Sequence, residues 1–290
     1  MWLSGAIMNA LKPEETASLQ AAAVRIRQDI LRMVRAGGAG HVGGAMSCAD
    51  IMAAHYFSIL RIDPAKPNWP DRDRLILSAG HKCMALYAAL RQRGYFDESI
   101  LDTYGALKSR VPGHPVMQKL PGVEANTGAL GHGLSIAGGM AMGLKLKKSP
   151  AKVYVVMGDG ELAEGSNWEA AAAASHHKLD NLLVFVDCNG LQLSGPTAEI
   201  MNYGPLAAKW AAFGWSVRSI DGHDFGQIVG NARAAPFEAG KPSVVIANTM
   251  KAKGMSFAEG KVDYHYWKPK GDEMARAVAE LAAAAEGLQS

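Results

Sequence analysis

The sequence predicts an α/β fold in which helices cover both faces of a parallel sheet. Apolar runs alternate with helical segments along most of the 290 residues, as they do where helices join parallel strands. The runs are also nearly continuous in hydrophobicity, for example "VYVVM" from Val153 and "LLVFV" from Leu182, which is typical of strands buried on both faces. A chain of this length can form one large domain. We expect residues 16–290 to form it, after an N-terminal extension of residues 1–15.

Periodicity and end signals place the elements of the first half. A helix is predicted over residues 16–36, where apolar residues recur at helical spacing, and it ends at Gly37-Gly38 because glycine accepts the left-handed conformation that ends helices. The stretch "GGAGHVGGAMS" is expected to be a loop that leads into a helix from residue 48 or 49 to 60. A strand over 75–78 opens through Gly80-His81 into a helix over 82–93. Residues 105–133 are rich in glycine and proline and are expected to form a long functional loop.

The second half alternates regularly. Apolar runs indicate strands, and apolar residues at helical spacing between them indicate helices. The predicted helices cover residues 134–147, 166–176, 205–213, 225–235 and 272–286. The predicted strands cover residues 152–157, 182–186, 215–220 and 243–248.

Composition excludes several classes of protein. The formal net charge is only +3 and no run of Lys or Arg occurs, so we expect no nucleic-acid partner. No segment is apolar for the roughly 18 residues that a membrane span needs, and the N-terminus carries no signal-peptide pattern. The three cysteines lack metal-ligand spacing. We therefore expect a cytoplasmic protein that binds no membrane.

Two of the predicted strands end in similar polar clusters. One strand runs into Gly158-Asp159-Gly160 and the other into Asn189-Gly190. Ligands of open parallel sheets bind beyond the carboxyl ends of the strands, where glycines and a helix N-terminus favour phosphate. A carboxylate and an amide oxygen are ligands that Mg²⁺ or Ca²⁺ prefers. The pair therefore indicates a metal–diphosphate site, although Asp and Asn also end strands simply as turn formers.

Several further motifs complete a resemblance to one family. "GDGELAEGSNWEA" followed by "DCNG", with thirty residues from Asp159 to Asn189, resembles the thiamine-diphosphate motif. "GHVGGAMSCADI", "DRLILSAGHKCMALYAAL", "PGHP", "GVEANTGALGHG" and "KAKGMSF" with "HYWKP" occur in the order found in the diphosphate-binding half of transketolases. The resemblance covers residues 20–275 and implies the thiamine-diphosphate-binding fold.

The resemblance implies a cofactor site for thiamine diphosphate and Mg²⁺ (or Ca²⁺). Metal ligands would be the side chains of Asp159 and Asn189 and the main-chain carbonyl of Leu191. The basic "KAKG" loop implies a diphosphate contact from Lys251 or Lys253, of which we take Lys253 as the cofactor-binding residue. The remaining residues expected at the cofactor are His81, Gly128, Ala129, Leu130, Gly158, Gly160, Glu161 and His265.

The resemblance also implies catalytic and interface residues. The histidines that match the family's active-site channel are His41, His81, His114 and His265. Imidazoles can hydrogen-bond sugar hydroxyls, move protons and stabilise charge on a carbonyl oxygen. Glu164 and Glu169 match interface carboxylates, although acidic residues are also common where a helix begins.

The implied activity is a transketolase reaction, the transfer of a two-carbon ketol unit from a ketose, or its phosphate, to an aldose. In the family a glutamate of a second, pyrimidine-binding domain activates the cofactor, and no such domain follows in this sequence. We therefore expect the N-terminal subunit of a split transketolase, active only with a C-terminal partner subunit, most simply as α2β2. Pentose phosphates are the default substrates, while a specialised catabolic sugar, such as a branched or sulfonated one, stays open.

Three alternatives share part of the pattern. The α subunit of a 2-oxoacid dehydrogenase also carries Gly-Asp-Gly and the metal Asn, but the histidine motifs suit sugar hydroxyls better. A deoxyxylulose-phosphate synthase shares more of the motifs and is usually one longer chain. A non-catalytic scaffold subunit of the same fold has no physical need for metal ligands.

Overall fold

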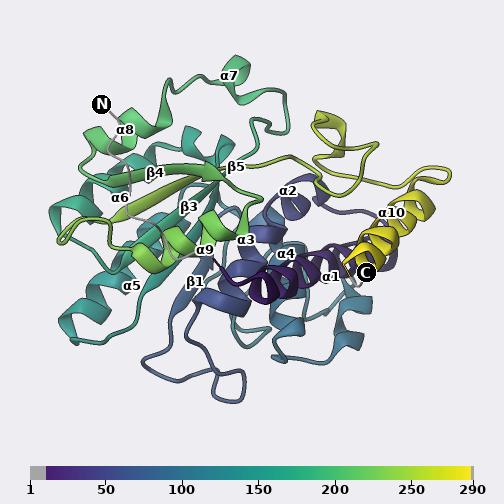
Figure 1. Cartoon of the computed structure of the whole chain (residues 1–290), viewed down its shortest axis with the longest axis horizontal. Helices are drawn as coiled ribbons and strands as arrows, with labels where there is room; N and C mark the ends of the chain where they lie inside the picture. Colours follow the sequence, from purple (N-terminus) through teal and green to yellow (C-terminus); the bar gives the residue numbers. More distant parts are fainter. Residues whose placement is uncertain (1–10, 289–290) are drawn as a thin grey trace.

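In the computed structural model, residues 11–288 are described, and they form a five-stranded parallel sheet with helices on both faces (Figure 1). The strand order is β1-β2-β3-β5-β4. Their bounds are β1 Arg74–Leu77, β2 Val153–Gly158, β3 Leu182–Cys188, β4 Ser216–Asp221 and β5 Ser243–Asn248. All five predicted strands are present, each within two residues of its expected ends, and the predicted fold class is confirmed.

Side chains that alternate along each strand enter two separate cores. Tyr154, Val156 and Phe185 pack on one face against α1, α3, α4 and α9. Val155 and Val184 pack on the other face against α5, α6 and α8. Burial of both faces explains why β2 and β3 are continuously apolar in sequence.

The helices are α1 Pro13–Gly37, α2 Val42–Ser47, α3 Ala49–Ala54, α4 Cys83–Gln92, α5 Gly133–Leu146, α6 Gly165–His176, α7 Thr197–Ile200, α8 Leu206–Ala212, α9 Phe225–Ala234 and α10 Glu273–Gly287.

Three expectations about the helices need correction. The stretch expected as a loop contains α2, a buried helix of six residues. The helix expected to reach residue 60 changes at His55 into a π-helical turn over His55–Ile59. Helix α1 begins at Pro13, so it includes the last residues of the predicted N-terminal extension, whose residues 1–10 lie outside the described part.

The long loop is confirmed. Residues 105–132, all within the described range, form neither helix nor strand. Between residues 11 and 288, no helix has the length and apolar character needed to cross a membrane. Helix α10 lies beside α1 (Figure 1).

Candidate active site

A cavity of about 360 Å³ lies at the carboxyl ends of the central strands. Strands β2 and β3 run parallel with Gly158 paired to Asp187, so the two polar clusters that follow them meet at one edge of the sheet. The cavity is lined by His41, Gly44, His81, Lys82, His114, Gly128, Leu130, Gly158, Asp159, Gly160, Glu161, Ala163, Glu164, Asn189, Leu191, Gln192, Leu193, Lys251 and His265.

Asp159 joins the two strand ends through its carboxylate. One oxygen accepts the Gly160 N–H at 2.9 Å and the other accepts the Gly190 N–H at 2.7 Å. The side chain is buried, and no cationic side chain of the described residues lies within 4.0 Å of it. Burial raises the pKa of Asp159 and Asp187 adds to that rise, while Lys82 opposes it. A buried carboxylate without an ion-pair partner favours a bound cation.

Asn189 and Leu191 supply the other expected metal oxygens. The Asn189 amide donates to the Ser47 hydroxyl at 3.3 Å and its oxygen accepts the Leu191 N–H at 3.1 Å. Both residues line the same cavity as Asp159. Carboxylate, amide and carbonyl oxygens are the donor set that a hard divalent cation prefers, so the residues present fit the expected metal.

Two buried lysines bring positive charge to the cavity. The Lys82 ammonium is 2.6 Å from the Asp187 carboxylate. The Lys251 ammonium donates to the Leu191 carbonyl at 3.0 Å and lies 3.0 Å from Nδ1 of His265. Burial, with the nearby Lys82, lowers the pKa of Lys251 to about 8. Among residues 11–288 the Lys251 ammonium forms no ion pair with a carboxylate, so it can contact an anion such as a diphosphate.

Two adjacent glycines of α2 make room for these lysines. A Cβ on Gly43 would lie 2.7 Å from the Tyr264 carbonyl and 2.9 Å from Cε of Lys251. A Cβ on Gly44 would lie 2.9 Å from Cε of Lys82. The glycines that suggested a loop are therefore required by the close passage of two lysine side chains over the helix.

The four predicted histidines form one cluster. The His41 ring lies 5.4 Å from His81, 5.9 Å from His114 and 5.6 Å from His265, measured between ring centroids. His81 and His265 stack at 5.3 Å. The four residues come from four separate segments of the chain, and all of them line the cavity.

The cluster favours neutral imidazoles. Burial lowers the pKa of all four rings. For His81 burial, followed by Lys82, lowers the pKa to about 2, and for His265 burial, followed by Lys251, lowers it to about 3. Neutral imidazole has one donor and one acceptor nitrogen, which suits hydroxyl groups of a sugar. An anion in the cavity would oppose these shifts.

Glu161 organises the loops around the cavity through its side chain. The buried carboxylate accepts the Gly131 N–H at 3.0 Å, the Gly158 N–H at 3.2 Å and the Ser78 hydroxyl. It therefore links the end of β1, the loop before α5 and the end of β2. In that loop Gly128 has φ of 146°, a conformation that favours glycine.

Comparisons with known proteins identify the family of this chain. Residues 18–285 match the family described as transketolase, thiamine diphosphate binding domain.

The chain belongs to the transketolase family.

Curated relatives of similar length are subunits of transketolases. The chain is 45% identical over 268 residues to the 6-deoxy-6-sulfo-D-fructose transketolase subunit of Clostridium sp. (strain MSTE9), covering 92% of this chain and 98% of the relative. It is 42% identical to an apulose-4-phosphate transketolase subunit of Phocaeicola vulgatus, covering 95% of this chain and 97% of the relative. These relatives support the transketolase interpretation over the dehydrogenase, synthase and scaffold alternatives.

Solved transketolases share the fold. The enzyme from Leishmania mexicana superimposes with a TM-score of 0.82 at 27% identity, covering 94% of this chain and 46% of that chain. The enzyme from Campylobacter jejuni superimposes with a TM-score of 0.80 at 29% identity, covering 93% of this chain and 48% of that chain. The present chain thus spans slightly less than half the length of these solved transketolases.

Three predicted site residues do not line the cavity. Ala129 is exposed beside it. The Lys253 ammonium is 3.8 Å from Glu259, so the structure places Lys251, and not Lys253, at the cavity. Glu169 lies on the exposed side of α6, whereas Glu164 reaches the cavity rim.

The sequence prediction missed Lys82 and its partner Asp187. Lys82 directly follows His81 in "SAGHK", but nothing in a single sequence shows that its side chain turns inward toward a strand 105 positions away. Asp187, in an otherwise apolar strand, is the one signal that a buried cation faces β3, because unpaired carboxylates are rarely fully buried.

Proposed function

We propose that this chain is the diphosphate-binding subunit of a two-chain transketolase, which transfers a two-carbon ketol unit from a ketose to an aldose. One observation carries the proposal: the cavity unites an unpaired buried carboxylate at Asp159 with the cluster of four histidines. Curated relatives of matching length are named as transketolase subunits, which supports a chain that works with a partner.

The proposed cofactor is thiamine diphosphate with Mg²⁺ (or Ca²⁺). Asp159, Asn189 and the Leu191 carbonyl would hold the metal. The diphosphate would accept hydrogen bonds from Lys251 and from the main-chain amides of Gly160 and Glu161. Bound thiamine diphosphate would supply the carbon nucleophile and electron sink that cleavage beside a ketose carbonyl needs.

We assign the histidines to the sugar and to proton movement. His41, at the centre of the cluster, can donate to or accept from a substrate hydroxyl because its ring is neutral. His81 and His265 lie nearest the lysines, so they would stabilise negative charge on a carbonyl oxygen as donors. His114, the most exposed of the four, would contact the far end of the sugar.

The proposed partner is a C-terminal transketolase subunit that carries the pyrimidine-binding domain and the activating Glu, in an α2β2 assembly. Exposed carboxylates at Glu164, on the cavity rim, and at Glu169, on α6, would contact it.

Among substrates, the names of the relatives favour a specialised ketose. One relative is named for 6-deoxy-6-sulfo-D-fructose and another for apulose 4-phosphate. We propose a donor of this unusual kind ahead of the pentose phosphates. We also propose a cytoplasmic location, which three unpaired cysteines support.

The test is calorimetric titration of thiamine diphosphate and MgCl₂ into the chain, with and without the product of the neighbouring reading frame. A ketol-transfer assay should follow, with xylulose 5-phosphate, apulose 4-phosphate and 6-deoxy-6-sulfo-D-fructose as donors. We expect binding that depends on Mg²⁺, and turnover only with the partner. Absence of cofactor binding in both states would overturn the proposal, and turnover by the chain alone would overturn the two-chain assignment.

A further inference from the structure

The loop that brings Lys251 into the cavity contains a strained residue. Ala252 has φ of 61° and is fully buried, and a non-glycine residue in this region persists only where its surroundings hold it. Its N–H donates to the Gly43 carbonyl at 2.9 Å. The conformation of Ala252 sets the direction of the preceding Lys251 side chain, so whatever holds this loop also places the ammonium.

On the N-terminal side, His223 holds the loop. The Met250 N–H donates to Nε2 of His223 at 2.8 Å. Nδ1 of the same ring lies 2.6 Å from the Asp50 carboxylate. A ring nitrogen that accepts cannot carry a proton, so the proton is on Nδ1 and is donated to Asp50. Asp50 thereby fixes both the tautomer and the orientation of the ring.

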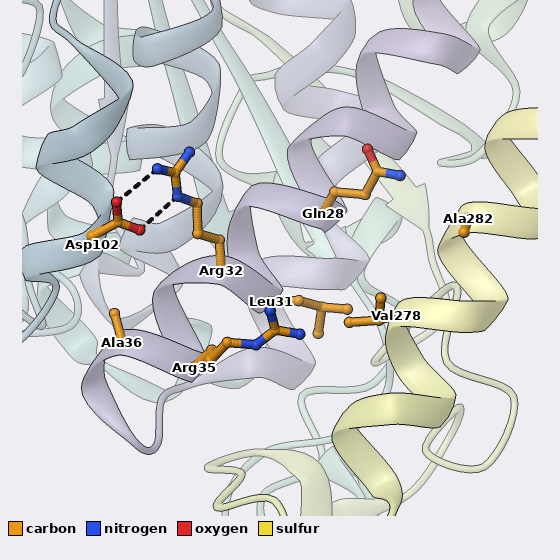
Figure 2. Close-up of a pocket in the computed structure, with 8 residues that line it drawn as sticks. All are labelled: Gln28, Leu31, Arg32, Arg35, Ala36, Asp102, Val278 and Ala282. Carbon is orange, nitrogen blue, oxygen red and sulfur yellow. Dashed lines mark hydrogen bonds and ion pairs between the residues drawn. The ribbon is translucent and has the colours of Figure 1, made fainter.

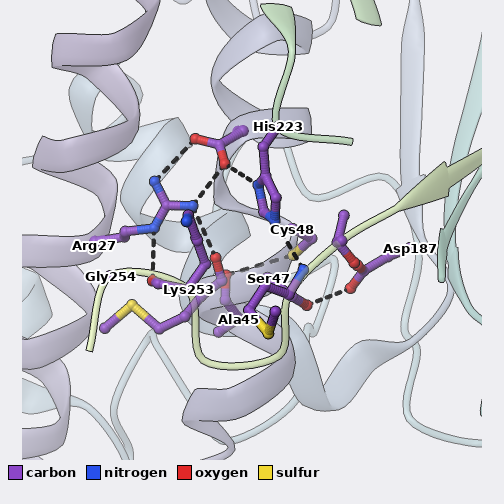
Figure 3. A network of polar contacts seen from close by, with 12 residues as sticks. Arg27, Ala45, Ser47, Cys48, Asp187, His223, Lys253 and Gly254 are labelled. Carbon is purple, nitrogen blue, oxygen red and sulfur yellow. Dashed lines mark hydrogen bonds and ion pairs between the residues drawn. The ribbon is translucent and has the colours of Figure 1, made fainter. Parts of the chain in front are cut away.

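On the C-terminal side, Arg27 holds the loop. Its Nε donates to the Lys253 carbonyl at 3.0 Å (Figure 3). Its terminal nitrogens donate to both oxygens of Asp50 at 2.9 and 2.7 Å. Gly254 has φ of 95°, and a Cβ there would lie 3.1 Å from Cδ of Arg27. The glycine therefore allows the arginine to lie against the loop.

Asp50 joins the two contacts. It is 6% exposed, and although burial raises its pKa, Arg27 and His223 outweigh that effect and lower the pKa to about 2. The carboxylate is thus ionised at neutral pH and bonds to both side chains. None of the three residues lines the cavity. They reach it through this loop, and Arg27 also donates to the Met46 carbonyl of α2 at 3.2 Å.

We infer that Asp50, Arg27 and His223 are positioning residues that clamp the loop on both sides of Ala252 and so hold the Lys251 ammonium in the cavity, beside His265. This inference rests on the proposed function in one respect, namely that Lys251 contacts the diphosphate. The clamp itself depends only on the contacts described above.

The test compares two replacements of His223 in the complex with the partner subunit. Asn can keep the donor to Asp50 but is too short to accept from Met250, whereas Gln can reach Met250. We expect His223→Asn to weaken binding of thiamine diphosphate with Mg²⁺ about fivefold to tenfold, the scale of one hydrogen bond, and His223→Gln to stay within about twofold. In a Lys251→Met background, His223→Asn should weaken cofactor binding by less than a further factor of about two, because the effects of two residues that act through each other are not additive.

A second measurement does not involve the cofactor. Amide hydrogen exchange in the complex without cofactor should be faster at residues 250–253 in His223→Asn than in the wild type or His223→Gln. Asp224→Ala is the matched control. Asp224 follows His223 in the chain and its side chain caps α9, but it is not one of the three residues of the clamp. Gly254→Ala, which disturbs Arg27, should reproduce the effect if His223→Asn does not fold.

The two measurements separate the inference from the proposed function. Unchanged exchange at residues 250–253 would overturn the clamp, whether or not the cofactor binds. An equal loss of affinity with and without the Lys251 side chain would overturn the link to Lys251. If the wild-type complex binds no cofactor, the proposed function fails, and exchange still decides whether the clamp holds the loop.

Discussion

Two hollows in this molecule differ in a way that volume does not reveal. The larger, about 640 Å³, lies between α1 and α10 (Figure 2), and the cavity at the strand ends has only about 360 Å³. In the larger hollow, Arg32 is already paired with Asp102, and Leu31 and Val278 form apolar walls. The smaller cavity gathers buried groups whose charges are unpaired or whose pKa values are shifted. Convergence of such groups, and not size, identifies a functional site.

The same contrast appears in two ion pairs. The side chains of Lys82 and Asp187 are 3% and 0% exposed, whereas those of Arg32 and Asp102 are 33% and 52% exposed. Both pairs have short distances, of 2.6 Å. From the distances alone, the two pairs would be expected to contribute equally to stability. Because the buried pair is desolvated, however, loss of one partner lowers the free energy of unfolding strongly only in that pair.

The largest expected effect follows from that contrast. Lys82→Met should lower the free energy of unfolding by about 3–5 kcal/mol, because it leaves the buried Asp187 carboxylate without its cation. Arg32→Met should cost a small fraction of that amount, because water solvates Asp102. Urea unfolding of both variants measures the difference. The double variant Lys82→Met/Asp187→Asn should recover most of the loss, and equal costs for the two single variants would contradict the comparison.

The second prediction concerns cofactor affinity. Asp159→Asn removes the negative charge of the expected metal site and should weaken binding of thiamine diphosphate with Mg²⁺ on the order of a hundredfold, equivalent to about 3 kcal/mol. Arg35→Ala, in the larger hollow, is the matched control and should leave affinity unchanged. Calorimetry on the complex with the partner subunit measures both. A similar affinity for Asp159→Asn and the wild type would remove Asp159 from the metal site.

The third prediction compares two glycines. Gly43→Ala should destabilise the protein by about 1–3 kcal/mol, because its Cβ would meet the Tyr264 carbonyl at 2.7 Å and Lys251 at 2.9 Å. Gly143→Ala, on α5, meets no atom within 4 Å and should stabilise by about 0.5–1 kcal/mol through helix propensity. Thermal unfolding checks both signs. Equal effects would mean that both the Tyr264 main chain and the Lys251 side chain move aside without cost.

The parts of the fold that are local in sequence were predictable. Apolar runs indicated β1, β2, β3 and β5, and the edge strand β4 was predicted although polar residues interrupt it. The polar residues after β2 and β3 meet as parallel strands require. Four histidines from four motifs also share one cavity, as the resemblance implied. Their roles, and those of the proposed metal ligands, stay predictions.

Features that depend on contacts between distant parts of the chain were not predictable from the sequence pattern. Helix α2 forms although two of its six residues are glycines, because lysines from elsewhere pack over them. Lys251 enters the cavity and Lys253 does not, because Ala252 between them takes a positive φ that distant side chains impose. Strand β5 lies between β3 and β4, and no local signal specifies that order.

The smallest expected effect is a pH dependence of the histidine cavity, which the larger hollow lacks because no histidine lines it. The pKa of His265 is lowered to about 3 by burial first and then by Lys251, whereas an unfolded histidine titrates near 6.5. Between these values the unfolded chain binds a proton that the folded chain does not. This histidine's contribution to stability is therefore complete above pH 6.5 and is lost as pH falls toward 3.

His265→Gln should accordingly make stability less dependent on pH below 6.5. The expected difference is at most about 1 kcal/mol between pH 6.5 and 5.5, because an unfolded histidine is already half protonated at pH 6.5 and water reaches part of the ring in the folded protein. Val278→Ala removes an apolar side chain from the larger hollow and no titratable group, so it should lower stability equally at both pH values. Urea unfolding at each pH gives both slopes. A wild-type slope in His265→Gln would mean that His265 is solvated, and the contrast between the two hollows would then rest on the buried ion pair and Asp159 alone.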